Sequence, residues 1–250
     1  ENPLFVEKNL WVRMGTGWVT LFFYLRILFY PAPLLYYYGY DMITVTGPAH
    51  MRVTFSVLFY LILIIIAVWN FRKKGFISFA ILWYIGAILL YSNILFPVPG
   101  IVGERFAFNA SLGFCMAFVG VIFIIFQTDP RNLTIEMDVR LKILASVILV
   151  MIPYATLTLT RNQDWRSLNN LLTGDIKFLD NSVRANIDLG NFYLDHSDTT
   201  KAIRYLEKAT AIWPDYDHCI QLRDLHNLKG ERQRAAYFQR LGEQMHPQRR

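Results

Sequence analysis

The chain has 250 residues, a net charge of +6 at neutral pH, and a composition that is 54% hydrophobic and 16% aromatic. This apolar content exceeds that of ordinary soluble domains, and it is unevenly placed: 14 of the 25 Lys and Arg and 12 of the 19 Asp and Glu follow residue 160. The sequence therefore predicts a membrane part and a water-soluble tail. Because the basic residues are dispersed and form no stripe with interleaved aromatics, it argues against nucleic-acid binding and predicts membrane lipid as a partner.

Five apolar runs are long enough to cross a hydrocarbon core of roughly 30 Å. Backbone polar groups in lipid must be satisfied within their own segment, so each run is predicted to be helical. The predicted spans are about 11–30, 52–70, 75–92, 111–127 and 141–159. The expected fold class is all-α: a polytopic transmembrane domain over 1–160 with a cytoplasmic N-terminus, followed by a short extracytoplasmic tail.

The orientation is predicted from Lys and Arg in short loops, which favour the cytoplasmic side. Three clusters agree in the five-span scheme: Lys8 and Arg13 at the start, Arg72, Lys73 and Lys74 between the second and third spans, and Arg131 and Arg140 between the fourth and fifth. The loops 31–51 and 93–110 and the tail then face a lumen or periplasm. Arg26, inside the first span, is expected to snorkel to the interface.

The segment 92–115, SNILFPVPGIVGERFAFNASLGFC, joins the third and fourth spans and is too apolar for an ordinary solvated loop. Glu104 and Arg105 nevertheless stand side by side in its middle. One interpretation is structural: the two charges attach the loop to neighbouring helices through local ion pairs. The loop's position at a membrane surface leaves a binding role open as well.

Other chemistry is sparsely represented. Cys115 and Cys219 form no CxxC or Cys/His spacing, and the five histidines are scattered, so the sequence predicts no metal site and no cofactor. There is no Gly-rich nucleotide loop and no nucleophile triad, and the catalytic residues of the chain are not identified.

The tail is predicted to contain a bridge over 161–180 and two tetratricopeptide-like repeats over 181–250. In the first repeat, small residues let two helices approach closely; its packing residues are Leu189, Gly190, Tyr193, Ala202, Leu206, Ala209 and Pro214. A degenerate second copy runs from about 216 to 247, with Leu222, Gly230, Ala235, Gly242 and Pro247, and with Arg223 in place of the small residue. Two repeats are fewer than the three or so that a free solenoid needs, so the tail is expected to lean on the membrane part, the bridge or a partner protein.

Several landmarks together resemble one known family. They are Glu1-Asn2-Pro3, then Arg13 and YLRILFYP ending at Pro31, Tyr40-Asp41, the loop residues Ser92, Asn93, Phe96, Pro97, Glu104, Arg105, Ser111, Gly113 and Phe114, and RNQDW at 161–165. In this order they are similar to the C-terminal portion, the second membrane block plus repeats, of the transmembrane O-mannosyltransferases of the GT-C class and their bacterial relatives. The family usually has Leu-Tyr and then Pro-Ser after its Glu-Arg pair, where this chain has Ala107, Phe108, Ala110 and Ser111.

The resemblance implies a glycosyltransferase that uses a polyprenyl-phosphate sugar, with Arg105 on the donor phosphate and Glu104 orienting it. It also implies repeats that contact an acceptor or partner protein. The family's catalytic carboxylates lie in an N-terminal half that this chain lacks, and Asp41 and Glu104 are the only carboxylates expected on the far side of the membrane part. Two alternatives stay open: a non-catalytic scaffold subunit that keeps the fold and binds partners through the repeats, and an adaptor anchored by the membrane part.

Overall fold

The computed structural model describes residues 2–39, 42–72, 75–129 and 135–245, and within these ranges the regular structure is entirely helical. The chain forms two compact units, residues 1–162 (the membrane unit) and residues 163–250 (the tail). The membrane unit contains η1 (Pro3–Phe5), α1 (Leu10–Phe29), α2 (Met51–Phe71), α3 (Phe76–Leu89), η2 (Glu104–Ala107), α4 (Phe108–Ile125) and α5 (Met137–Asp164), the last of which runs just past the unit boundary. The all-α class predicted from the sequence is confirmed.

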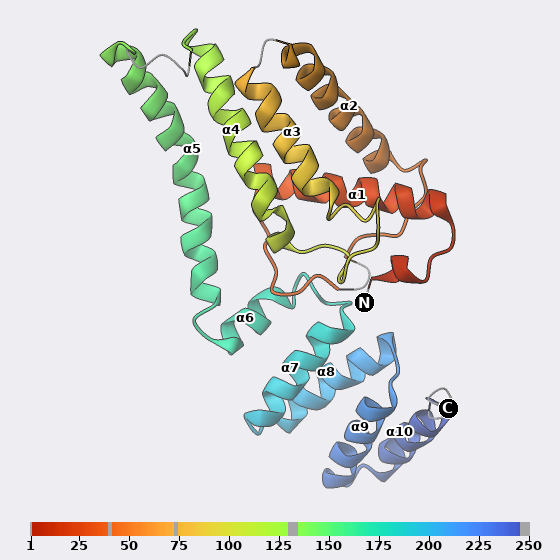
Figure 1. Cartoon of the computed structure of the whole chain (residues 1–250). Helices are drawn as coiled ribbons and strands as arrows, with labels where there is room; N and C mark the ends of the chain where they lie inside the picture. Colours follow the sequence, from red (N-terminus) through yellow and green to blue (C-terminus); the bar gives the residue numbers. More distant parts are fainter. Residues whose placement is uncertain (1, 40–41, 73–74, 130–134, 246–250) are drawn as a thin grey trace. The chain divides into compact units, whose positions relative to one another are not determined.

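Helices α2, α3 and α4 pack side by side and antiparallel (Figure 1). Ser78 Oγ donates to Ala67 O at 2.9 Å, joining α3 to α2. Gly113 allows α4 to approach α3 closely, because a Cβ there would lie 2.6 Å from Tyr84 N and 2.7 Å from Ala80 O. The segments next to these helices also pack together: the ring of Tyr91, just after α3, stacks on that of Phe106, just before α4, with 4.7 Å between the ring centres.

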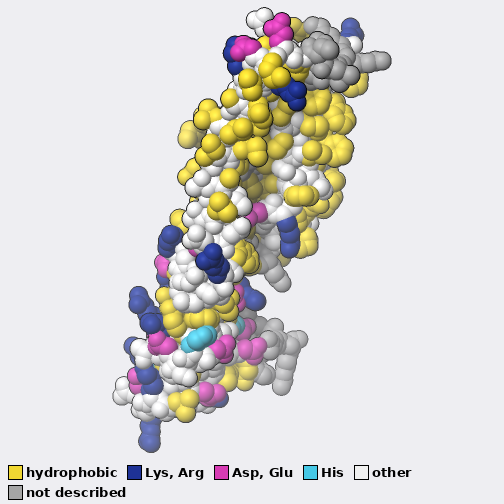
Figure 2. Space-filling view, turned by 90° about the vertical axis from the view of Figure 1, so that its left-hand side faces the viewer, with side chains coloured by type: hydrophobic (Ala, Val, Ile, Leu, Met, Phe, Trp, Pro, Cys, Tyr) yellow, Lys and Arg dark blue, Asp and Glu magenta, His cyan; other side chains and the backbone are white. Residues whose placement is uncertain are grey.

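Within the described part of the chain, three helices are long and apolar enough to cross a membrane: Met51–Phe71, Glu104–Ile125 (η2 with α4) and Met137–Asp164. They correspond to the predicted spans 52–70, 111–127 and 141–159. Their large apolar side chains are mostly exposed, as expected for a lipid-facing surface, and α5 has no buried residue. Figure 2 shows this apolar surface on one face of the membrane unit and the charged side chains gathered on the tail.

The two other predicted spans form α3 and α1, which are not among these three helices. The run 75–92 forms only the 14-residue α3, about 21 Å long at 1.5 Å per residue. The run 11–30 forms α1, which runs across the ends of α2, α3 and α4 instead of along them (Figure 1). Ten of the 20 residues of α1 are buried, against four of 21 in α2.

The contacts of α1 show why it lies across the bundle. A Cβ at Gly17 would lie 2.5 Å from Ile94 Cγ1, and seven residues later Tyr24 Oη accepts a hydrogen bond from Gly103 N at 3.3 Å. Both partners belong to the single loop between α3 and η2. On its other side, Thr16 Oγ1 accepts from Thr46 N at 3.0 Å, in the loop that precedes α2. Because two turns of α1 contact the same connecting loop, α1 runs along the end of the bundle where that loop lies.

This arrangement bears on the predicted sides of the N-terminus and of the 93–110 loop. Asn2 Nδ2 donates to Asn93 Oδ1 at 2.7 Å and to Val98 O at 2.9 Å, so the N-terminal segment lies against the 93–103 loop. A cytoplasmic N-terminus and an extracytoplasmic 93–110 loop cannot both hold. Lys8 and Arg13 therefore lie at the opposite end of the bundle from Arg72, while Lys73, Lys74 and Arg131 fall outside the described residues.

The tail consists of α6 (Leu168–Asp175), α7 (Val183–Asp195), α8 (Thr199–Ile212), α9 (Tyr216–Leu228) and α10 (Arg232–Met245). Helices α7 and α8 form one hairpin, and α9 and α10 form a second. Their turns match at an interval of 33 residues. Ser197 and Gly230 both have positive φ (61° and 76°), and Asp198 N donates to Tyr193 O just as Glu231 N donates to His226 O, each at 2.9 Å.

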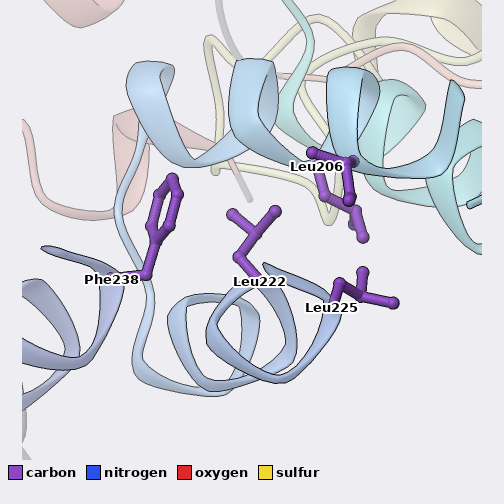
Figure 3. Packing of buried hydrophobic residues seen from close by; sticks show 5 residues of the cluster. Leu206, Leu222, Leu225 and Phe238 are labelled. Carbon is purple, nitrogen blue, oxygen red and sulfur yellow. The ribbon is translucent and has the colours of Figure 1, made fainter. Parts of the chain in front are cut away.

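The two hairpins share an apolar core that includes Leu206, Leu222, Leu225 and Phe238 (Figure 3). Beside it, the buried ring of His226 stacks on Phe238 and hydrogen-bonds to Glu207 of α8 and to Glu231 at 3.0 and 2.8 Å. The polar contacts of His226 therefore join the first hairpin to the second.

Candidate functional site

The 92–105 loop is organised by Asn93, which is 1% exposed and has a φ of 62°. Its Nδ2 donates to Ile101 O at 2.8 Å, and its Oδ1 accepts from Val98 N at 3.0 Å and from Asn2. Ser92 Oγ donates to Leu89 O at 2.7 Å and accepts from Ile94 N at 3.1 Å. The Ser-Asn pair of the motif thus closes the loop on itself.

The same contacts bring together sequence landmarks that are far apart in the chain. Asn2 and Asn93 are 91 positions apart and directly bonded. Glu1, the preceding residue of the first landmark, lies outside the described residues, as do Tyr40 and Asp41. No local sequence pattern predicts the contact between Asn2 and Asn93.

Glu104 attaches the loop after α1 to η2. Its Oε1 accepts from Leu35 N at 2.9 Å and from the hydroxyl of Tyr38, and Leu35 N also lies 3.1 Å from that hydroxyl. Burial, and after it the Glu104 carboxylate, raises the pKa of Tyr38 above its usual range, while the nearby charge of Arg26 opposes the shift. Tyr38 is therefore a neutral hydrogen-bond donor to Glu104 at physiological pH.

Arg105 is exposed, and its guanidinium lies 5.1 Å from the centre of the Phe106 ring. Among the described residues it has no carboxylate partner, and the neighbouring Glu104 bonds to Leu35 and Tyr38 instead. The adjacent acid and base therefore have separate environments. The described contacts include no bond between the two side chains, and the role of Glu104 in orienting Arg105 stays a prediction.

A second arginine, Arg26, lies near this group and was given no binding role in the sequence analysis. It is exposed on α1, its Nη1 donates to Ala32 O at 3.3 Å, and its charge acts on Tyr38. Its place inside an apolar helix is the sequence feature that could have predicted a functional role for Arg26.

The remaining loop residues of the motif have mainly packing roles. Phe96 is exposed, Pro97 is half-buried, Gly113 packs on α3, and Phe114 contacts Phe29 of α1 at 5.0 Å. Ser111 Oγ donates to Phe108 O at 2.6 Å. These residues frame Glu104 and Arg105 without adding a further charged group.

In the tail, the predicted packing residues lie between α7 and α8. Leu189, Ala202, Leu206 and Ala209 are buried, and a Cβ at Gly190 would lie 2.8 Å from Leu206 Cγ. Tyr193 is partly exposed and stacks on Tyr205 at 5.8 Å with Lys201 beside it. Pro214 follows α8.

The second hairpin repeats this packing with different residues. Leu222 and Ala235 are buried, and Gly242 packs against Cys219, where its Cβ would lie 3.2 Å from Cys219 Cβ. Arg223 instead pairs with Asp224 at 2.7 Å, so its long side chain does not block the helix contact. Pro247 lies outside the described residues.

The fold defines an all-α integral membrane protein with a helical tail. The chain is 26% identical over 159 residues to the mouse protein O-mannosyl-transferase TMTC3, a match that covers 63% of this chain and 16% of the relative. It is 25% identical over 138 residues to mouse TMTC1 (55% of this chain, 14% of the relative) and 24% identical over 138 residues to human TMTC1. The resemblance to the C-terminal portion of the transmembrane O-mannosyltransferases is thus confirmed.

The chain spans at most 16% of the length of these relatives. No protein-family model matches it. No solved structure matches it either. This distant similarity supports a role related to that of the membrane glycosyltransferases.

Proposed function

We propose that this chain is the donor-side membrane part of a GT-C glycosyltransferase that takes its sugar from a polyprenyl phosphate. Arg105 binds the donor phosphate in this proposal. The observation that carries it is an exposed arginine, placed on an apolar loop at one end of the membrane unit, for which the described residues provide no carboxylate partner.

The chemistry of Arg105 suits a lipid phosphate. A guanidinium presents two parallel N–H groups to a phosphate, and charge-assisted bonds of this kind are stronger than neutral ones. Glu104 supports the position indirectly, because its bonds to Leu35 and Tyr38 hold η2 in place without neutralising Arg105. The exposed apolar side chains of Phe108 and Leu112 on the following helix suit the lipid tail.

The tail binds the acceptor or a partner protein in this proposal, on the lumenal or periplasmic side of the membrane. Two stacked helical hairpins with a shared core provide a surface for such contacts, as tetratricopeptide repeats do. We assign no catalytic residue, since the described contacts of Glu104 serve the loop itself.

The test compares polyprenyl-phosphate binding by the full chain and its Arg105 variants in nanodiscs. Arg105→Ala should weaken binding by about 1.5–3 kcal/mol, or roughly 10- to 150-fold, and Arg105→Lys by less, because the charge stays while the bidentate geometry is lost. Arg72→Ala removes another exposed cation, at the opposite end of the bundle, and should bind normally. The affinity for polyprenol, which lacks the phosphate, should be the same for all variants. Normal phosphate binding by Arg105→Ala would end the donor-site proposal.

A second candidate is a non-catalytic scaffold subunit. It is favoured by the tail, which is a compact unit with its own core and with Trp213 and Tyr237 exposed on it. If Arg105→Ala leaves lipid binding unchanged while Trp213→Ala abolishes association with a defined membrane partner, the scaffold function replaces the enzymatic one.

A further inference from the structure

The first step concerns the place of α1. Its residues Gly17 and Tyr24 both contact the α3–η2 loop, and Thr16 contacts the loop that precedes α2. Both loops lie at one end of the α2–α3–α4 bundle, and α1 lies across that end (Figure 1). Helices that span a hydrocarbon core of roughly 30 Å end near the boundary between hydrocarbon and headgroups.

The second step concerns an exposed apolar surface at the same end, which we call the interfacial patch. Its residues come from the N-terminal segment, the start of α1 and the tip of the loop: Phe5, Val6, Leu10, Trp11, Leu95 and Phe96. Val6 is 80% exposed and Phe96 is 51% exposed. The hydrogen bonds of Asn2 to Asn93 and Val98 hold the two halves of the patch together.

The third step identifies what covers this patch. The loop in front of α2 packs on α1, and the exposed Met51 and Phe55 begin the lipid-facing surface of α2. Lys8, between Val6 and Leu10 in the chain, and Arg52, beside Met51, are both exposed, and among the described residues neither has a carboxylate partner. Apolar and aromatic side chains bordered by cations match the acyl–headgroup boundary, where lipid phosphates lie.

We propose that α1 lies in the plane of the membrane surface and that the interfacial patch inserts into the acyl–headgroup boundary of the bilayer. Because α1 contacts the loop that leads into the lipid-facing surface of α2, the occupant is lipid. The N-terminal segment and the 93–103 loop then lie on one side of the membrane. This inference does not involve Arg105 and stands apart from the proposed donor site.

The first test measures depth by spin labels on the full chain in phosphatidylcholine nanodiscs, with both free cysteines replaced by Ala. Labels at Val6→Cys and Phe96→Cys should collide more with dissolved oxygen than with a water-soluble nickel chelate. They should read as shallower than a label at Leu61→Cys, which is exposed on α2, and deeper than one at Lys229→Cys on the tail. Nickel access equal to that at Lys229 would overturn the proposal, and so would protection from both reagents, which would show that protein covers the patch.

The second test measures sidedness with a membrane-impermeant maleimide on sealed vesicles, before and after permeabilisation. Lys8→Cys and Pro99→Cys should react from the same side, and Arg72→Cys from the other. Reaction of Lys8→Cys together with Arg72→Cys would mean that α1 crosses the membrane and would overturn the proposal. Because neither test uses polyprenyl phosphate, their failure and that of the donor site are distinguishable.

Discussion

Removing the Glu104 carboxylate should destabilise the membrane unit by an amount that follows from its contacts. Leu35 N keeps the Tyr38 hydroxyl as an acceptor, 3.1 Å away, but the hydroxyl proton of the buried Tyr38 loses its acceptor. One orphaned buried donor that was bonded to a charged group costs about 1.5–3 kcal/mol. Glu104→Ala should therefore lower the melting temperature by roughly 3–10 °C. Glu104→Gln keeps an acceptor oxygen and should lose less.

The assay is thermal unfolding in detergent, with Arg105→Ala as the matched control. Because Arg105 is exposed and no carboxylate in the described ranges pairs with it, Arg105→Ala should stay within about 0.5 kcal/mol of the parent chain. The double variant should equal the sum of the single changes, since the two side chains share no contact. A coupling energy above about 1 kcal/mol would show that Glu104 and Arg105 form an ion pair and would refute the reasoning.

Three further predictions concern the tail, the loop and the topology. Gly190→Leu should make the tail sensitive to protease, because its Cβ would lie 2.8 Å from Leu206 of the facing helix and overpacking costs about 1–3 kcal/mol. Gly174→Leu is the control and should leave the tail resistant, since a Cβ there would have no atom nearer than 4.0 Å. Equal resistance of both variants would contradict the α7–α8 contact. Asn93→Ala removes three hydrogen bonds and should lower stability by about 2–4 kcal/mol while exposing the N-terminal segment to proteolysis, and an unchanged cleavage pattern would count against its anchoring role. A cysteine at Arg72 should label from one side of the membrane and one at Lys229 from the other; labelling of both from one side would mean that the number of crossings is wrong.

The helical class, the spans of α2, α4 and α5 and the tail hairpins were predictable because their signals are local. Long apolar runs, helix periodicity and small residues at fixed spacing require no knowledge of distant contacts. The place of α1 was not predictable in this way. A helix buried by protein loops and a helix surrounded by lipid need the same apolar composition, so hydropathy alone does not separate them.

The candidate site was predictable in its residues but not in its contacts. The apolar loop with Glu104 and Arg105 stood out in the sequence, and the adjacency of the charges suggested that they act on each other. In the structure, Glu104 bonds to a loop 66–69 positions earlier in the chain and Arg105 is left exposed. The Asn2–Asn93 bond depends in the same way on the tertiary path of the chain.

The central claim, that a lipid phosphate lies at Arg105, is tested most directly by photo-crosslinking. A polyprenyl phosphate with a photoreactive group beside the phosphate is crosslinked to the full chain in phosphatidylcholine nanodiscs, and the labelled peptides are mapped by mass spectrometry. We predict label on residues 103–108 that unlabelled polyprenyl phosphate displaces and that Arg105→Ala abolishes. Label spread over the lipid-facing residues of α2 and α5, undiminished by competitor, would contradict the claim.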